Sequence, residues 1–173
     1  MTAGVVSGNL DPRAPFVDPD TFMLVVELEL RRAIRLQYYV SLLALQADVE
    51  QSAELADRAA LHREVAETIR DQIRSTDVVS VMPSSHLLEV VLVSTYLDNL
   101  PAIIDRIAIA ASAQAGDAEG SMSRMTLSIG GACFPTTARE RAELVHQAES
   151  LSMEARAEPG TSGYRYRLAR RVS

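Results

Sequence analysis

Apolar residues recur at helical spacing in four segments of the chain, and each segment is predicted to be an amphipathic helix that packs on a core. The first helix follows Asp18 and Pro19, an N-cap residue and a proline in the first helical position, and is expected to run to about Leu36. The other predicted helices span about 61–74, 98–111 and 144–155. The helix at 98–111 begins at a group of helix-opening residues that includes Asn99.

Short apolar runs between these helices predict β-strands, at about 39–45, 78–82, 87–93, 125–133 and 164–168. Only four residues separate the second and third runs, and this spacing predicts a β-hairpin. The alternation of helices and strands indicates an α/β (α+β) fold with a central mixed five-stranded sheet flanked by helices. Residues 1–17 lack periodicity and are interpreted as a flexible leader, so the domain is expected to span 18–173.

The first helix carries apolar residues on more than one face. Phe22 and Val26 follow the spacing of a core-facing stripe, whereas Leu24 and Leu28 lie on another side of the helix. A helix that is apolar on two sides needs a second covering surface. This pattern favours self-association, and we expect a homodimer.

Composition narrows the possible functions. The chain has 173 residues, enough for one domain, and a formal net charge of −6, which argues against binding to nucleic acid through a basic face. All of its 17 basic residues are arginine. Its longest apolar stretches are interrupted by charges, so no membrane partner is expected. The lone Cys133 excludes an internal disulfide and fits a cytoplasmic protein.

Two segments show similarity to a known family. Residues 126–132, TLSIGGA, resemble the T-x-S-I-G-V-A strand of GGDEF domains, the domains of diguanylate cyclases. Residues 147–156 resemble the A-D-x-A-L-Y-x-A-K helix of the same family, with Arg156 where the family has Lys. The resemblance extends over about 20–168 in the family's order of elements. It implies a GGDEF or nucleotide-cyclase-like fold.

The positions that carry cyclase chemistry differ from the family pattern. The family places its first metal-binding carboxylate in a D-x-D motif at the end of the first strand, and here Gln46 takes that position, two residues before Asp48. The family's G-G-D/E-E-F turn corresponds to the following five residues: Pro83, Ser84, Ser85, His86 and Leu87. Proline removes both an N–H donor and the freedom of glycine, and no acidic residue remains in the turn. The resemblance therefore implies no catalytic residues, no bound metal and no cofactor.

One binding motif of the family is retained. Many diguanylate cyclases carry an inhibitory R-x-x-D site, five residues before the turn, that binds cyclic di-GMP. Here Arg74 and Asp77 have that spacing, and Arg106 matches a further arginine on the helix after the hairpin. Arginine can donate two hydrogen bonds to a guanine edge or to a phosphate, and Asp77 can accept from guanine. The alternative is local: Arg74 would be a charge at a helix C-terminus, and Asp77 a turn residue.

Two functions remain open on these observations. In the first, the domain is a catalytically inactive GGDEF module that binds cyclic di-GMP through Arg74, Asp77 and Arg106. In the second, it is a nucleotide-independent domain for dimerisation or for docking of a protein partner. Calorimetric titration with cyclic di-GMP would separate the two.

Overall fold

The computed structural model describes residues 11–48, 55–83, 85, 87–116, 125–159 and 163–172. In this part of the chain the helices are α1 (Pro19–Leu36), α2 (Leu55–Gln72), α3 (Leu100–Gly116) and α4 (Arg141–Ala157). A short 3₁₀ turn, η1 (Leu97–Asn99), precedes α3. The strands are β1 (Phe16–Val17), β2 (Val40–Asp48), β3 (Val78–Met82), β4 (Leu87–Val93), β5 (Thr126–Phe134) and β6 (Gly163–Leu168). Of the helices described here, none is long and apolar enough to cross a membrane.

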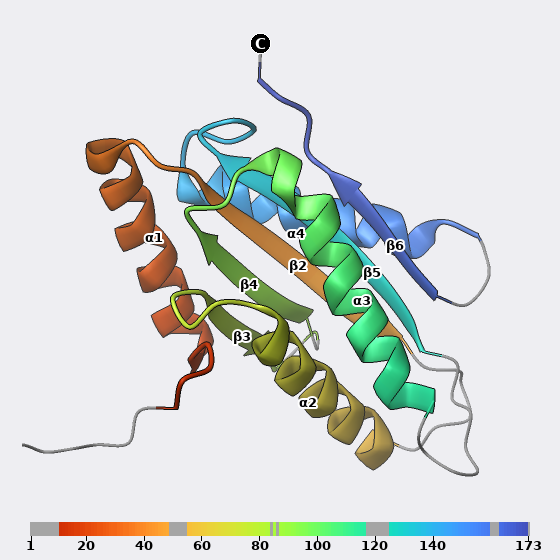
Figure 1. Cartoon of the computed structure of the whole chain (residues 1–173). Coiled ribbons are helices and arrows are strands. Elements are labelled where there is room, and N and C mark those ends of the chain that lie inside the picture. Colours follow the sequence, from red (N-terminus) through yellow and green to blue (C-terminus); the bar gives the residue numbers. More distant parts are fainter. Residues whose placement is uncertain are drawn as a thin grey trace, which may run out of the picture.

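The described strands form one mixed sheet in the order β1-β3-β4-β2-β5-β6 (Figure 1). The inner pairs β3–β4, β4–β2 and β2–β5 are antiparallel, whereas the edge strands β1 and β6 each pair in parallel with their neighbour. Strands β3 and β4 form the predicted hairpin, and their bounds are those expected from the sequence. The hairpin and β5 therefore belong to the same sheet, as the family resemblance implied.

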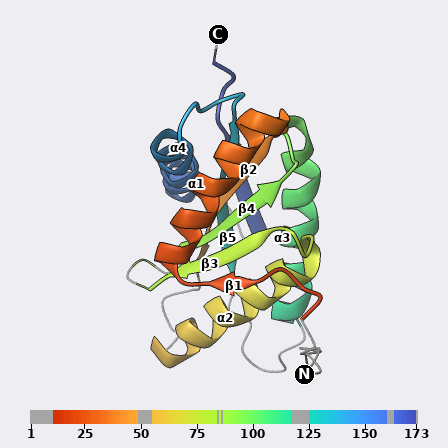
Figure 2. The same ribbon diagram turned by 90° about the vertical axis from the view of Figure 1, so that its left-hand side faces the viewer.

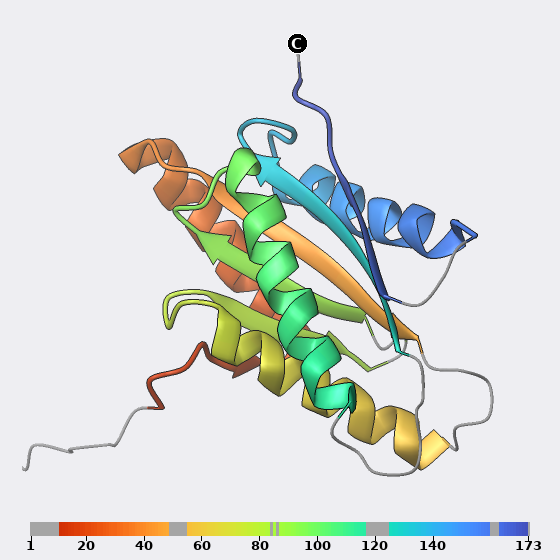
Figure 3. The same cartoon turned by 45° about the vertical axis from the view of Figure 1, so that its right-hand side comes forward.

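Helices cover both faces of the sheet (Figures 2 and 3). Helices α1 and α4 pack on one face, and α2 and α3 pack on the other. The alternation of side chains along β2 supplies both cores: Val40, Leu42 and Ala44 join the first core, and Leu43 and Leu45 join the second. A strand buried on both faces has the continuous apolar sequence that β2 shows.

Helix α1 begins as its sequence predicts. The Asp18 side chain accepts a hydrogen bond from the Thr21 amide at 2.9 Å, and Pro19 occupies the first helical position. Phe22 and Val26 are fully buried against the sheet. Gln37 ends the helix in a left-handed backbone conformation, with a φ of 57°.

The leader and the strand count differ from the expectation. Within the described residues the sheet has six strands instead of five, because β1 lies within the segment interpreted as a flexible leader and pairs with β3. Ala14 is fully buried, and its carbonyl accepts a hydrogen bond from Arg70 of α2 at 2.7 Å. Arg70 also pairs with Asp11 at 3.0 Å. These contacts fix the last part of the leader on the domain, while residues 1–10 lie outside the described residues.

Candidate functional site

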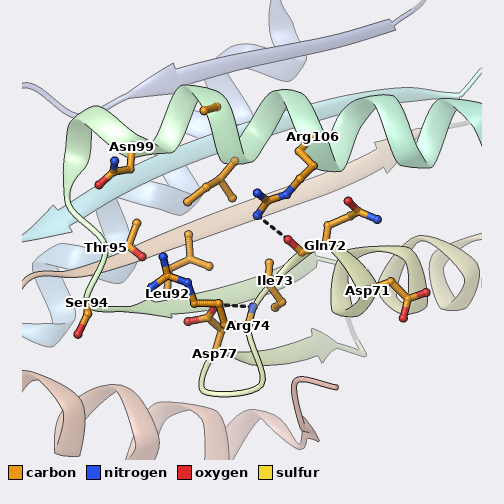
Figure 4. A pocket seen from close by; sticks show the side chains of 12 residues that line it. Asp71, Gln72, Ile73, Arg74, Asp77, Leu92, Ser94, Thr95, Asn99 and Arg106 are labelled. Carbon is orange, nitrogen blue, oxygen red and sulfur yellow. Dashed lines mark hydrogen bonds between the residues drawn. The ribbon is translucent and has the colours of Figure 1, made fainter. Parts of the chain in front are cut away.

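A pocket of about 500 Å³ lies between the C-terminal end of α2, the sheet and the start of α3 (Figure 4). Two stretches of the chain form its walls: residues 71–77, at the end of α2 and in the loop that follows, and residues 92–106, which run from β4 through the next loop and η1 into α3. Arg74, Asp77 and Arg106 all line this pocket. The three residues selected from the sequence are therefore brought together by the fold.

Asp77 closes the turn that carries Arg74. Its carboxylate accepts a hydrogen bond from the Arg74 amide at 2.9 Å and one from the Val93 amide at 2.9 Å. The Asp77 amide in turn donates to the Arg74 carbonyl at 3.0 Å. Burial raises the pKa of the Asp77 carboxyl above its ordinary value, although the two amide donors oppose the shift. Asp77 thus has the turn role of the local alternative, while each of its oxygens keeps a second lone pair that can accept from a ligand.

Arg74 lies just outside the helix that was expected to end near it. Helix α2 stops at Gln72, and Arg74 follows in the loop before β3, where its side chain is exposed. Within the described residues, no group accepts a hydrogen bond from the Arg74 guanidinium. All of its donors are therefore open to a ligand in the pocket.

Arg106 approaches the pocket from α3. One terminal nitrogen of its guanidinium donates to the Gln72 carbonyl at 2.6 Å, which satisfies a backbone acceptor at the C-terminal end of α2 (Figure 4). This bond holds the Arg106 side chain beside the pocket. Because arginine carries five N–H donors, the remaining ones can still contact an anion or a base.

Three polar residues of the opposite wall were missed in the sequence. Ser94, Thr95 and Asn99 line the pocket from the loop after β4 and from η1. Ser94 has a φ of 53°, an uncommon conformation for a residue other than glycine, and it turns the chain from β4 toward η1. The sequence signal of Asn99 was interpreted as a helix opening. That signal is correct for the element but does not show that the side chain reaches a pocket.

The family's signature turn lies at the other end of the hairpin. Leu87 is buried in the core beneath α1, and the Ser85 amide donates to the Met82 carbonyl at 3.3 Å. Pro83 is exposed. Ser84 and His86 lie outside the described residues.

The second region of interest is the end of β2, where the resemblance placed the metal-binding carboxylate of active cyclases. Arg156 of α4 holds Asp48 with two hydrogen bonds, from Nε at 2.8 Å and from Nη2 at 2.7 Å. Gln46 offers a neutral amide whose Oε1 is buried without a hydrogen-bond partner among the described residues. In the same residues there is no group of three or more His, Cys, Asp or Glu side chains that could hold a metal ion. This set does not fit a hard cation, which needs several oxygen ligands, preferably anionic.

The sheet beneath α4 also contains a buried acid that the sequence analysis did not single out. Glu89 of β4 is fully buried, and burial together with the neighbouring Glu149 carboxylate raises the pKa of Glu89 to about 8. Ser80 is its register partner on β3, and the Ser80 hydroxyl has no hydrogen-bond partner in the described structure. A charged residue within the apolar run of β4 is the signal that would have identified this position.

Comparison with solved structures places the fold. The GGDEF domain of YfiN (also called TpbB) from Pseudomonas aeruginosa matches with a TM-score of 0.70 at 23% identity, over 88% of this chain and 96% of that one. The coiled-coil and GGDEF structure of DgcB from Caulobacter crescentus, in complex with cyclic di-GMP, matches with a TM-score of 0.73 at 11% identity, over 90% and 81%. The GGDEF domain of FimX from P. aeruginosa gives 0.67 at 13%, over 88% and 98%. The sequence matches no protein-family model and no curated protein. The chain has the fold of GGDEF domains.

Proposed function

We propose that this domain is a catalytically inactive GGDEF-type signalling module that binds cyclic di-GMP in the pocket of Arg74, Asp77 and Arg106. The observation that carries the proposal is the convergence of these three residues on one pocket of about 500 Å³. They were selected from the sequence by their match to the R-x-x-D motif of GGDEF domains and its further arginine, and they come from a loop and a helix that are about thirty positions apart in the sequence. A volume of this size lies in the range of small-molecule sites.

The chemistry of the pocket suits a guanine nucleotide. The Arg74 guanidinium is exposed and has no internal acceptor among the described residues, so it can fork two hydrogen bonds to a guanine edge or to a phosphate. Arg106 supplies a second cation on the adjacent wall. The two arginines form a local basic site on an acidic chain.

Loss of catalysis is supported by the state of the former metal site. Cyclase chemistry needs carboxylates that are free to bind metal, and Asp48 is already held by Arg156. Gln46 carries no charge, and the described residues do not form a metal-binding cluster. Among the structures with this fold, that of DgcB contains cyclic di-GMP, so the fold is compatible with binding of this nucleotide.

Titration calorimetry with cyclic di-GMP tests the proposal. We expect the wild-type chain to bind, and Arg74→Ala to weaken binding by roughly 5- to 100-fold, about 1–3 kcal/mol, the value of one good bidentate contact to guanine. Arg63→Ala is the matched control, because it removes an exposed arginine of α2 that does not line the pocket. This variant should bind as the wild type does.

Two results would count against the proposal. Equal affinities of the wild type and Arg74→Ala would place the binding site elsewhere. The absence of binding by the wild type at micromolar concentration would favour the nucleotide-independent interaction domain.

A further inference from the structure

Helix α1 has an uncovered apolar face. Leu24 is 56% exposed, Leu28 is 42% exposed and Ile34 is 67% exposed, although α1 also buries a full apolar stripe against the sheet. Leu24 and Leu28, four positions apart, lie on the side of α1 opposite to the buried residues Phe22 and Ala33, whereas Ile34 lies between that side and the buried stripe. In Figure 2, α1 lies on the outside of the molecule, beside α4.

The charges along this face are separated by sign. Asp20 and Glu27 lie toward the N-terminal end, and Arg31 and Arg35 lie toward the C-terminal end. Glu27 and Arg31 pair with each other within the helix at 3.0 Å. Asp20 and Arg35 have no ion pair within the described residues. They lie fifteen positions apart, which is about 22 Å along a helix.

We propose that a second copy of this chain docks on this face, with the two α1 helices antiparallel. An antiparallel arrangement brings Asp20 of each copy close to Arg35 of the other, so the two unpaired charges form two equivalent ion pairs. Between these pairs, the exposed Leu24 and Leu28 of one helix pack against those of the other. A parallel arrangement would instead place like charges opposite each other, which disfavours it.

The two charges also have local roles. Asp20 lies in the first turn of α1 and Arg35 in the last turn, where each has a favourable interaction with the helix dipole. That local effect acts on the stability of a single copy. The monomer–dimer equilibrium is a separate quantity, which sedimentation velocity measures directly.

The proposed interface does not involve the proposed nucleotide pocket. Helices α1 and α4 cover one face of the sheet, whereas the pocket lies between α2, α3 and the opposite face. A dimer of this kind therefore leaves Arg74 and Arg106 accessible. Binding of cyclic di-GMP and dimerisation through α1 can fail or succeed independently.

Sedimentation velocity of the full chain over a wide concentration range tests the interface. We expect a reversible dimer for the wild type and a monomer for Leu24→Glu at the same concentrations, because a buried unpaired charge opposes association. Ile109→Glu is the matched control, since Ile109 is 66% exposed on α3 and far from the proposed interface. This variant should dimerise as the wild type does.

A charge exchange tests the orientation. Asp20→Arg and Arg35→Asp, each alone, should weaken the dimer by about tenfold, and the double exchange should restore it, because the ion pairs are then reversed in both copies. Circular dichroism of each variant confirms that the fold is retained. A wild-type chain that stays monomeric, or a Leu24→Glu variant that dimerises normally, would overturn the proposal. A double exchange that fails to restore association would overturn the antiparallel arrangement.

Discussion

Glu89 is a buried acidic residue whose ionised form destabilises the fold. Its neighbours on β4 are apolar, yet its carboxyl group is fully buried beneath α4 and lies near the Glu149 carboxylate. Desolvation disfavours the charged form, and so does a second negative charge nearby. The pKa of Glu89 is therefore raised from its ordinary value of 4.5 to about 8.

This shift makes stability depend on pH. In the unfolded chain Glu89 loses its proton near pH 4.5, whereas in the folded protein it keeps the proton up to about pH 8. The free energy of unfolding should therefore fall as pH rises between these two values, because the folded state binds one more proton there. Glu89→Gln removes this dependence and should stabilise the protein by about 1–3 kcal/mol at pH 8.

Urea denaturation at several pH values measures the effect. Glu64→Gln, which changes an exposed glutamate on α2, is the control and should retain the wild-type slope. Parallel stability curves for the wild type and Glu89→Gln between pH 5 and pH 8 (roughly the window set by the shifted pKa) would contradict this account of Glu89.

At the scale of elements, α4 lies directly on β5. A Cβ atom at Gly130 would overlap backbone atoms of Ala148 and Ser152, so the close approach of helix and strand requires glycine there. The Ser152 hydroxyl donates to the Ser128 carbonyl at 3.0 Å and links the same two elements. The T-x-S-I-G pattern in the sequence thus corresponds to a packing requirement.

The two adjacent glycines of β5 offer a matched test of this contact. Gly130→Ala should destabilise the protein by about 2–3 kcal/mol, because the new methyl group meets backbone that can move only if α4 shifts. At Gly131 the same change meets a side-chain atom of Leu168 at 2.7 Å, and a side chain can rotate away. The midpoint of urea denaturation should therefore fall further for Gly130→Ala. Equal midpoints would show that α4 is not held against β5 in this way.

The sequence predicts those elements whose signals are local. The bounds of β3 and β4 follow from two apolar runs with a short polar spacer, and the structure confirms them. Strand β1 could not be predicted, because its two residues carry no periodicity and their partner strand β3 is distant in the sequence. The pocket also combines residues with a local sequence signal and residues that only the fold brings together. The fixed spacing of Arg74 and Asp77 is visible in the sequence, whereas Asn99 joins them only through the fold.

In the whole molecule, two regions to which the family resemblance assigned a role are separate. One is the end of β2, where Asp48 pairs with Arg156 on the face that α4 covers. The other is the pocket between α2 and α3. In our proposal only the second region retains a nucleotide function, so loss of catalysis and retention of binding are compatible in one domain.

The proposed absence of cyclase activity can be tested on the whole protein. Incubation with GTP and magnesium or manganese should give no cyclic di-GMP, because too few free carboxylates remain to bind the metal ions. Arg156→Ala should be inactive as well, since it frees one carboxylate but leaves Gln46 uncharged. An active diguanylate cyclase in the same buffer provides the positive control. Formation of cyclic di-GMP by the wild-type chain would contradict the inactive assignment.

Hydrogen exchange with and without saturating cyclic di-GMP is the decisive test of the proposed binding pocket, because it locates the ligand on the folded chain. We expect slower exchange in the loop that carries Arg74 and Asp77, and in the segment from Ser94 to Asn99 on the opposite wall of the pocket. Exchange at the end of β2 should be unchanged. Slower exchange confined to the region of Asp48 and Arg156, with no change around the pocket, would contradict the account.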